Sequence, residues 1–185
     1  IGIKGIVNTV KIMPIALAPV GSERDKDIAL GIRYAVDNGA KIINITFTKE
    51  FPINNEWVNA AIKYAEKNDV LLVCSSGNSS SDIDIIKTYP DDTNDNGKEI
   101  FNNLIKVGAS WFKLNKNLVT QFSNYGKNSV DIFAPGRNVY TSLPNNKYDF
   151  IDGTSMSAPI VSGVAALIRS HYPNLTAAEV KQIIM

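Results

Sequence analysis

The sequence predicts an α/β fold, with a mainly parallel sheet that carries helices on both faces. Strand-like and helix-like segments alternate along the chain, which favours strand-helix-strand units whose right-handed crossovers make neighbouring strands parallel. Two strand-like segments, 41–47 and 70–75, are almost continuously apolar, as expected of strands covered on both faces. Apolar residues at helical spacing between these strands predict the helices that would cover them.

The first half of the chain alternates strands and helices. Residues 11–17 (KIMPIAL) are predicted to form a strand, in which Pro14 suits an edge or irregular position. A helix follows, with Ser22 placed to begin it and Asn38-Gly39 placed to end it. The remaining elements of this half are a strand at 41–47, an amphipathic helix from Trp57 to about Asn68 and a strand at 70–75.

The second half begins with a polar stretch, 79–103, and ends in two helices. Strands are predicted between them at 104–110, 130–134 and 139–143. The first helix runs from Ser155 to His171 and is apolar almost all round, so we expect it to be buried in the centre of the molecule. The second begins at Thr176, which forms a capping box with Glu179.

Composition is that of an ordinary globular domain. The 185 residues include 19 Lys and Arg against 18 Asp and Glu, which leaves a formal net charge of +1, and 44% of them are hydrophobic. A single domain of this length buries a sizeable core, and the balanced charge gives no reason to propose nucleic acid as a partner. No stretch approaches the roughly 20 apolar residues that span a membrane. We therefore expect one domain over 1–185, with neither a nucleic-acid partner nor a membrane span.

Ser155 is the candidate nucleophile. The segment 152–159 (DGTSMSAP) places small residues directly before a helix, so that Ser155 stands at the helix start. Unpaired backbone N–H groups and the positive end of the helix dipole would stabilise an oxyanion formed beside it. The alternative is that the Ser and Thr of this segment only cap a buried helix.

Asn78 is a second candidate, because it follows the strand 70–75 directly. The carboxyl end of a parallel strand is where ligands usually bind, and an Asn there can present its amide N–H₂ into the crevice. The alternative is an ordinary Gly-Asn turn. The one cysteine, Cys74, lies inside the same strand and is interpreted as a small apolar residue.

These motifs resemble those of the subtilisin-like serine proteases. The segments 153–159 (GTSMSAP) and 162–167 (SGVAAL) are similar to the family's nucleophile motif. Other family segments recur in the right order across essentially the whole chain, namely 42–47 (IINITF), 76–78 (SGN), 105–109 (IKVGA), 122–126 (FSNYG) and 131–136 (DIFAPG). The resemblance implies a subtilisin-like fold whose N-terminal strands are missing, and a partial peptidase domain over 1–185.

The resemblance also implies roles for named residues. Ser155 would attack a peptide carbonyl, as in a serine endopeptidase, while Asn78 and the backbone N–H of Ser155 would hold the oxyanion. Two segments, Thr46-Phe47-Thr48 and Ser75-Ser76-Gly77, would line the main chain of a polypeptide substrate and its first specificity pocket. An extended peptide would bind along them as an added strand. The family usually has Gly at the position of Thr48, so this chain adds a side chain beside the substrate path.

The base of such a mechanism is missing from the sequence. The triad order of the family is Asp, His, Ser, and neither the Asp strand nor the His-Gly-Thr-His motif occurs here. The only histidine, His171, follows Ser155 on the same helix by 16 residues, or about 24 Å at 1.5 Å per residue. We therefore expect a piece of a longer protease that is inactive by itself. The alternative is a non-catalytic subtilisin-like module that binds peptides.

Three further expectations concern ligands, association and location. No cofactor is expected, although 92–97 (DTNDNG) fits the first half of a calcium loop, which makes structural calcium near Asp92, Asn94 and Asn96 a weaker hypothesis. Missing upstream strands would leave part of the sheet uncovered, which favours self-association. The resemblance implies a secreted or cell-envelope location.

Overall fold

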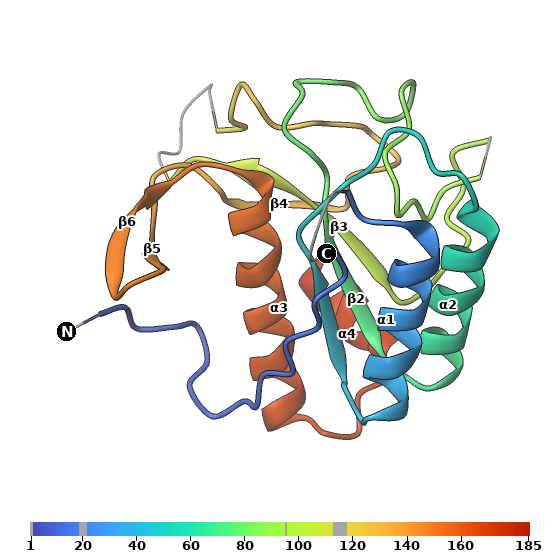
Figure 1. Cartoon of the computed structure of the whole chain (residues 1–185), viewed down its shortest axis with the longest axis horizontal. Helices are drawn as coiled ribbons and strands as arrows, with labels where there is room; N and C mark the ends of the chain where they lie inside the picture. The colour runs from blue at the N-terminus through green and yellow to red at the C-terminus, as the bar shows by residue number, and fades with distance from the viewer. Residues whose placement is uncertain (1, 19–21, 95, 113–117) are drawn as a thin grey trace.

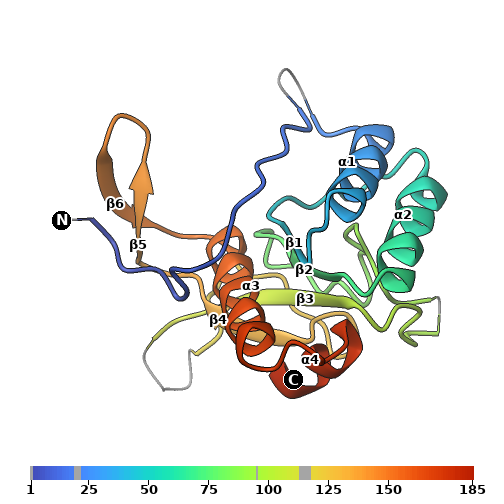
Figure 2. The same cartoon turned by 90° about the horizontal axis from the view of Figure 1, so that it is seen from below.

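The computed structural model describes residues 2–18, 22–94, 96–112 and 118–185. Four parallel strands form one sheet in the order β1-β2-β3-β4, and α1 and α2 cover one face while α3 and α4 cover the other (Figures 1 and 2). The elements are α1 (Asp25–Asp37), β1 (Ile42–Ile45), α2 (Asn55–Lys67), β2 (Leu71–Ser75), β3 (Leu104–Ser110), β4 (Ile132–Pro135), α3 (Thr154–His171) and α4 (Ala177–Ile184). The predicted fold class, with helices on both faces, is confirmed.

Strand β2 is fully buried because both of its faces lie in a core. Leu72 and Cys74 belong to the core under α1 and α2, whereas Leu71 and Val73 belong to the core under α3 and α4. Successive side chains of a strand point to opposite faces, so a central strand of this kind must be apolar at every position. This is the physical basis of the continuous apolar run in the sequence.

A two-stranded antiparallel hairpin stands apart from the main sheet. Its first strand, β5 (Val139–Leu143), matches the prediction, but its second, β6 (Lys147–Ile151), was not predicted. The turn between them contains Asn145 and Asn146 in the left-handed conformation, which Asn tolerates better than most residues. β6 leads after only two residues into α3, so the hairpin adjoins the start of that helix (Figure 1).

The predicted strand at 11–17 does not form. This segment is irregular and largely exposed, with Ile12 at 85% of its possible exposure. A strand needs a neighbour to bond its backbone groups, and in the described part of the chain β1 is an edge strand that pairs with β2 only. The outer edge of β1 therefore has no paired strand in the described part of the chain.

Two helix predictions also need correction. The first helix begins at Asp25 with Arg24 at its N-cap, so Ser22 does not cap it. Helix α3 is not buried on all sides, because Val164 and Leu167 are 36% and 41% exposed on the face turned away from the sheet. Thr176 and Glu179 do form the predicted capping box. No helix in the described ranges is long and apolar enough to cross a membrane.

Candidate active site

Ser155 lies in the first turn of α3, at the end of the molecule where β1 and β2 have their carboxyl ends (Figure 1). Gly153 makes this turn possible, since its φ of +151° is a conformation that other residues rarely adopt. The half-buried Ser155 donates its hydroxyl proton to the carbonyl oxygen of Thr46 at 2.8 Å. A backbone carbonyl accepts a hydrogen bond but is too weak a base to remove a proton, so this contact orients the hydroxyl without activating it.

The side-chain amide of Asn78 is fixed from the same helix turn. Its Oδ1 accepts hydrogen bonds from the backbone N–H of Thr154 at 2.9 Å and from the Thr154 hydroxyl at 3.0 Å. With Oδ1 held in this way, the Nδ2 donor remains for another acceptor. Nδ2 and the backbone nitrogen of Ser155 both lie 3.7 Å from the point where a Cβ on Gly153 would stand. Two nitrogen atoms that carry N–H groups therefore lie close to one small region beside Ser155.

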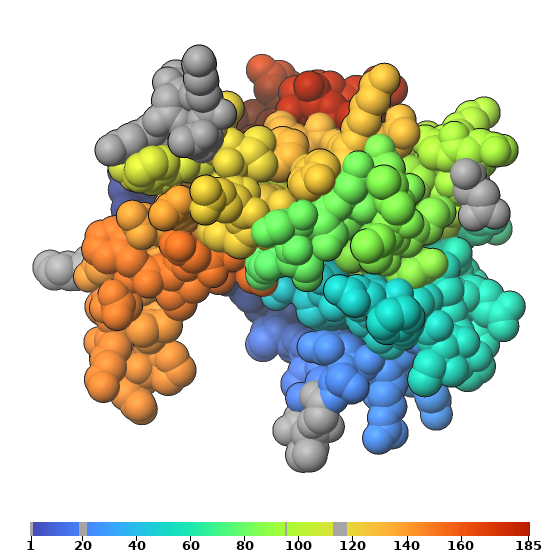
Figure 3. Space-filling model, turned by 90° about the horizontal axis from the view of Figure 1, so that it is seen from above, coloured from blue at the N-terminus to red at the C-terminus, as the bar shows by residue number. Residues whose placement is uncertain are grey.

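The two predicted substrate-binding segments continue directly from paired strands. Thr46, Phe47 and Thr48 follow β1 and are at least partly exposed, whereas Ser75, Ser76 and Gly77 at the end of β2 are buried. Figure 3 looks onto this end of the molecule, where the cyan loop after β1, the green loop after β2 and the orange segment before α3 lie next to one another. The structure thus brings all eight predicted site residues to the carboxyl end of the sheet.

Asn124 supports this arrangement and was not singled out by sequence reasoning. Its Oδ1 accepts hydrogen bonds from the backbone N–H groups of Ser79, at 2.9 Å, and Ser81, at 3.1 Å. Its Nδ2 donates a hydrogen bond to the carbonyl of Ser76 at 2.9 Å. One buried amide thereby holds the loop on both sides of Asn78. The only signal in the sequence was its place in the segment 122–126, which resembles a family motif but names no role.

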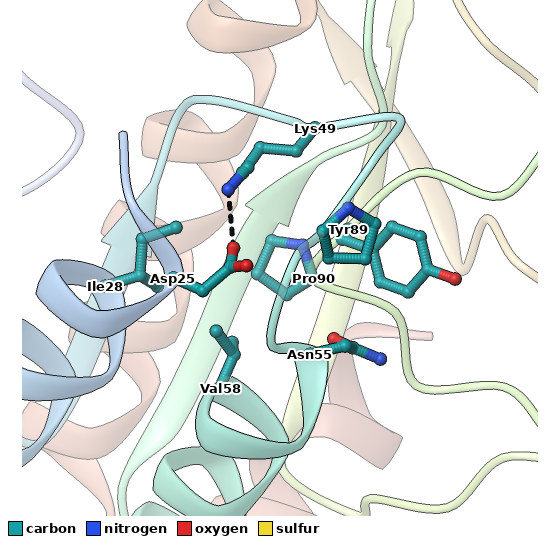
Figure 4. Close-up of a pocket in the computed structure, with 8 residues that line it drawn as sticks. Asp25, Ile28, Lys49, Asn55, Val58, Tyr89 and Pro90 are labelled. Carbon is teal, nitrogen blue, oxygen red and sulfur yellow. Dashed lines mark hydrogen bonds and ion pairs between the residues drawn. The ribbon is translucent and has the colours of Figure 1, made fainter. Parts of the chain in front are cut away.

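A small cavity between α1 and the loop after β1 contains a buried carboxylate (Figure 4). The Asp25 carboxylate accepts a hydrogen bond from the Lys49 ammonium at 2.5 Å. It also accepts hydrogen bonds from the backbone N–H groups of Ile53 and Asn54, at 2.7 and 2.8 Å. Burial alone raises the pKa of Asp25, but the hydrogen bonds from Lys49 and these two N–H groups outweigh it and lower the pKa. In the sequence, Asp25 was only an acidic residue in the first turn of a helix. Its long-range partners could not be foreseen.

The other nucleophile and base candidates lie away from this edge. His171 is the last residue of α3, whereas Ser155 is in the first turn of the same helix. Cys74 is fully buried, and the loss of solvation raises the pKa of its thiol to about 12. Because the thiolate is the reactive form, Cys74 is unreactive at neutral pH. The interpretation of Cys74 as a small apolar residue is consistent with this burial.

Three carboxylates gather around the Lys181 ammonium of α4. Its Nζ lies 3.4 Å from Asp92, 3.0 Å from Glu99 and 3.7 Å from Asp131. Burial, together with the charge of Asp131, raises the pKa of Asp92 to about 7 despite Lys181, and burial raises the pKa of Asp131 to about 6. We call this group the Lys181 cluster. The positive charge among these three carboxylates is thus the Lys181 ammonium.

The Lys181 cluster shares Asp92 with the predicted calcium loop. Asp92 is turned toward Lys181, while Oδ1 of Asn94 accepts the backbone N–H groups of Asn96 and Lys98 at 2.9 and 3.0 Å. Asp95 of the predicted loop lies outside the described residues. The contacts seen here keep the candidate ligands Asp92 and Asn94 engaged within the protein, and calcium binding at this loop stays a prediction.

The similarity to known proteins extends over the whole chain. The model of the subtilase family matches residues 1–185. Subtilisin DY of Bacillus licheniformis is 34% identical over 182 residues, which are 97% of this chain and 61% of that protein. The major intracellular serine protease of Bacillus subtilis (strain 168) is 37% identical over 153 residues, which are 82% of this chain and 44% of that protein.

A solved structure, sphericase, superimposes with a TM-score of 0.73 at 30% identity, covering 88% of this chain and 55% of that one. The chain thus spans at most 61% of the length of the relatives named here. The family model matches the sequence from one end to the other, and the structure has a parallel four-stranded sheet. This chain therefore belongs to the subtilase family of serine proteases.

Proposed function

We propose that this chain provides the nucleophile and the oxyanion site of a serine endopeptidase. The observation that carries the proposal is the convergence, beside Ser155, of the Asn78 Nδ2 and the Ser155 backbone N–H on the region next to Gly153. Two fixed donors at a helix start suit the negative charge that develops on a carbonyl oxygen under attack. The anchoring of Asn78 by Thr154 means that little reorganisation is needed at the moment of reaction.

The proposed reaction is acyl transfer through Ser155. The Oγ attacks the carbonyl carbon of a peptide bond, its proton passes to a base and on to the departing amine, and water then releases the acyl group. Among the described residues the hydroxyl donates to the Thr46 carbonyl, and His171 is about 24 Å away along α3. The base and its orienting carboxylate must come from other residues. We therefore expect the isolated chain to be inactive, because in subtilisin itself loss of the base lowers kcat by about 10⁶-fold.

The proposed substrate is an extended polypeptide that lies between the two segments beyond β1 and β2. The partly exposed segment Thr46-Phe47-Thr48 continues the edge strand β1, and an added peptide strand can bond to the backbone of such a segment without regard to its own side chains. A non-catalytic module that binds peptides is the alternative. The observation that favours it is the hydrogen bond of Ser155 to a carbonyl in place of a base.

Labelling with a fluorophosphonate separates these two functions. In full-length protein we expect the reagent to modify Ser155, to be blocked by Ser155→Ala and to be unaffected by Ser162→Ala, a serine two turns further along α3. Asn78→Leu should lower kcat by about 10²–10³-fold, the loss known for the equivalent change in subtilisin. Absence of labelling, or a labelling rate indifferent to Asn78→Leu, would favour the binding module.

A secreted or cell-envelope location is also proposed. A cell wall-associated protease of Bacillus subtilis (strain 168) is among the relatives and agrees with it, whereas the intracellular protease named above does not. Fractionation of cells that express the full-length protein is the test. Recovery of the protein only from the cytoplasm would refute this proposal.

A further inference from the structure

The pairing of β1 with β2 places Thr48 opposite Gly77. The ladder ends at the pair Ile45 and Cys74, and the same offset, continued for three residues, brings Thr48 to the level of Gly77. The contact confirms this level, because the Thr48 hydroxyl lies 3.2 Å from the point where a Cβ on Gly77 would stand. The Thr48 side chain therefore spans the space between the two segments that leave the sheet.

The loop that carries Thr48 is held firmly in this position. Lys49 forms two backbone hydrogen bonds with Tyr89, of 3.0 and 2.7 Å. Its ammonium is bound by the buried Asp25, which also binds the loop through the N–H groups of Ile53 and Asn54 (Figure 4). Moving Thr48 away from Gly77 would break several of these bonds, including a charged one.

The opposite wall is held equally well. The N–H of Gly77 donates to the Thr154 hydroxyl at 3.2 Å, and its carbonyl accepts the N–H of Asn124 at 2.9 Å. The carbonyl of Ser76 accepts from the hydroxyl of Thr88 at 3.2 Å and from the amide of Asn124. Both segments are therefore fixed, and the short distance between the Thr48 hydroxyl and Gly77 is fixed with them.

We propose that Thr48 restricts the substrate residue whose carbonyl is attacked to a small side chain, namely Gly, Ala or Ser; this inference rests on the proposed function. Ser155 donates to the carbonyl of Thr46, two residues before Thr48, so we place the side chain of the attacked residue between the two segments. That substrate side chain would then lie against Thr48. An aromatic ring would need the space that the Thr48 side chain takes beside Gly77, whereas a methyl group needs far less room.

The test uses full-length protein and two peptides that differ only in Ala or Phe at the residue before the cleaved bond. For the wild type we expect kcat/KM to favour the Ala peptide by more than tenfold, within the roughly 10–200-fold range that one excess methylene costs in a tight pocket. Thr48→Gly should raise kcat/KM for the Phe peptide at least tenfold and change the Ala peptide by no more than a few-fold. Glu50→Gly, which removes an exposed side chain from the same loop, is the matched control and should leave the ratio unchanged.

Each other outcome overturns the inference. A wild type that prefers Phe, or a Thr48→Gly variant in which both peptides change equally, would assign Thr48 a structural role only. If fluorophosphonate labels Ser155 and the Ala peptide is still not cleaved, the inference fails while the nucleophile assignment stands. If Ser155 is not labelled and neither peptide is cleaved, the proposed function fails together with it.

Discussion

Replacing Lys181 with Met tests how the Lys181 cluster stabilises the fold. The ammonium is 5% exposed and is the cation nearest to Asp92 and Asp131, whose side chains are 2% and 5% exposed. Met fills a similar volume, so the main effect is to remove the cation that lies within 4 Å of both carboxylates, while the buried Lys106 remains as a second positive charge near them. Breaking a buried ion pair from one side costs about 3–5 kcal/mol. We expect a loss of that size in the free energy of unfolding at pH 8.

The loss should depend on pH, with a sign that follows from the raised pKa values. Asp92 titrates at about 7 and Asp131 at about 6 in the folded protein, against about 4 for an unfolded carboxyl group. Between these values the folded state binds more protons than the unfolded state, so the free energy of unfolding falls as pH rises. Above pH 5 this excess amounts to about two pH units for Asp92 and about one for Asp131. At roughly 1.4 kcal/mol per proton and pH unit, we expect the wild type to lose about 4 kcal/mol from pH 5 to pH 8.

Other shifted carboxyl groups do not mask this effect. Asp25, Asp84 and Glu179 have lowered pKa values, so they lose their stabilising contribution only below about pH 4. At pH 5 the carboxyls of Asp92 and Asp131 are largely protonated, and the penalty of Lys181→Met should shrink there.

Urea unfolding followed by tryptophan fluorescence at pH 5 and pH 8 measures the destabilisation by Lys181→Met and the pH dependence of the wild type's free energy of unfolding. Lys67→Met is the matched control, since Lys67 is an exposed lysine in the last turn of a helix and should change stability by no more than about 0.5 kcal/mol. An equal penalty for Lys181→Met at both pH values would refute the reasoning. So would a wild type that is more stable at pH 8 than at pH 5.

Three further predictions concern the site and the surface. Asp25→Asn should lower the free energy of unfolding at pH 7 by about 2–4 kcal/mol in urea titrations, because it weakens the charged bonds to Lys49 and the loop. Gly153→Ala should abolish fluorophosphonate labelling, because the methyl would stand between the oxyanion donors and the φ of +151° costs an L-residue about 1–3 kcal/mol. We also propose self-association along the open β1 edge and the exposed apolar side of α3; a monodisperse monomer at high concentration in light scattering would contradict it.

The fold class and most of the elements could be predicted because they depend on local patterns. The run around β2 is apolar at every position since two cores cover it, and the capping box at Thr176 joins residues three apart. The strand expected at 11–17 was wrong for the opposite reason. Its apolar residues satisfy the local pattern, but a strand also needs a backbone partner, and in the described chain this segment pairs with no strand.

The sequence by itself determined which residue types could do chemistry: a serine at a helix start, an asparagine after a buried strand, and one histidine too far along the helix to help. It also determined the α/β class. Only the tertiary structure decided that Thr154 holds the Asn78 amide, that Asp25 anchors the loop of Thr48, and that Lys181 neutralises carboxylates of distant segments. These contacts join residues 24 to 89 positions apart. Strand register and helix packing bring such residues together, and no local pattern records them.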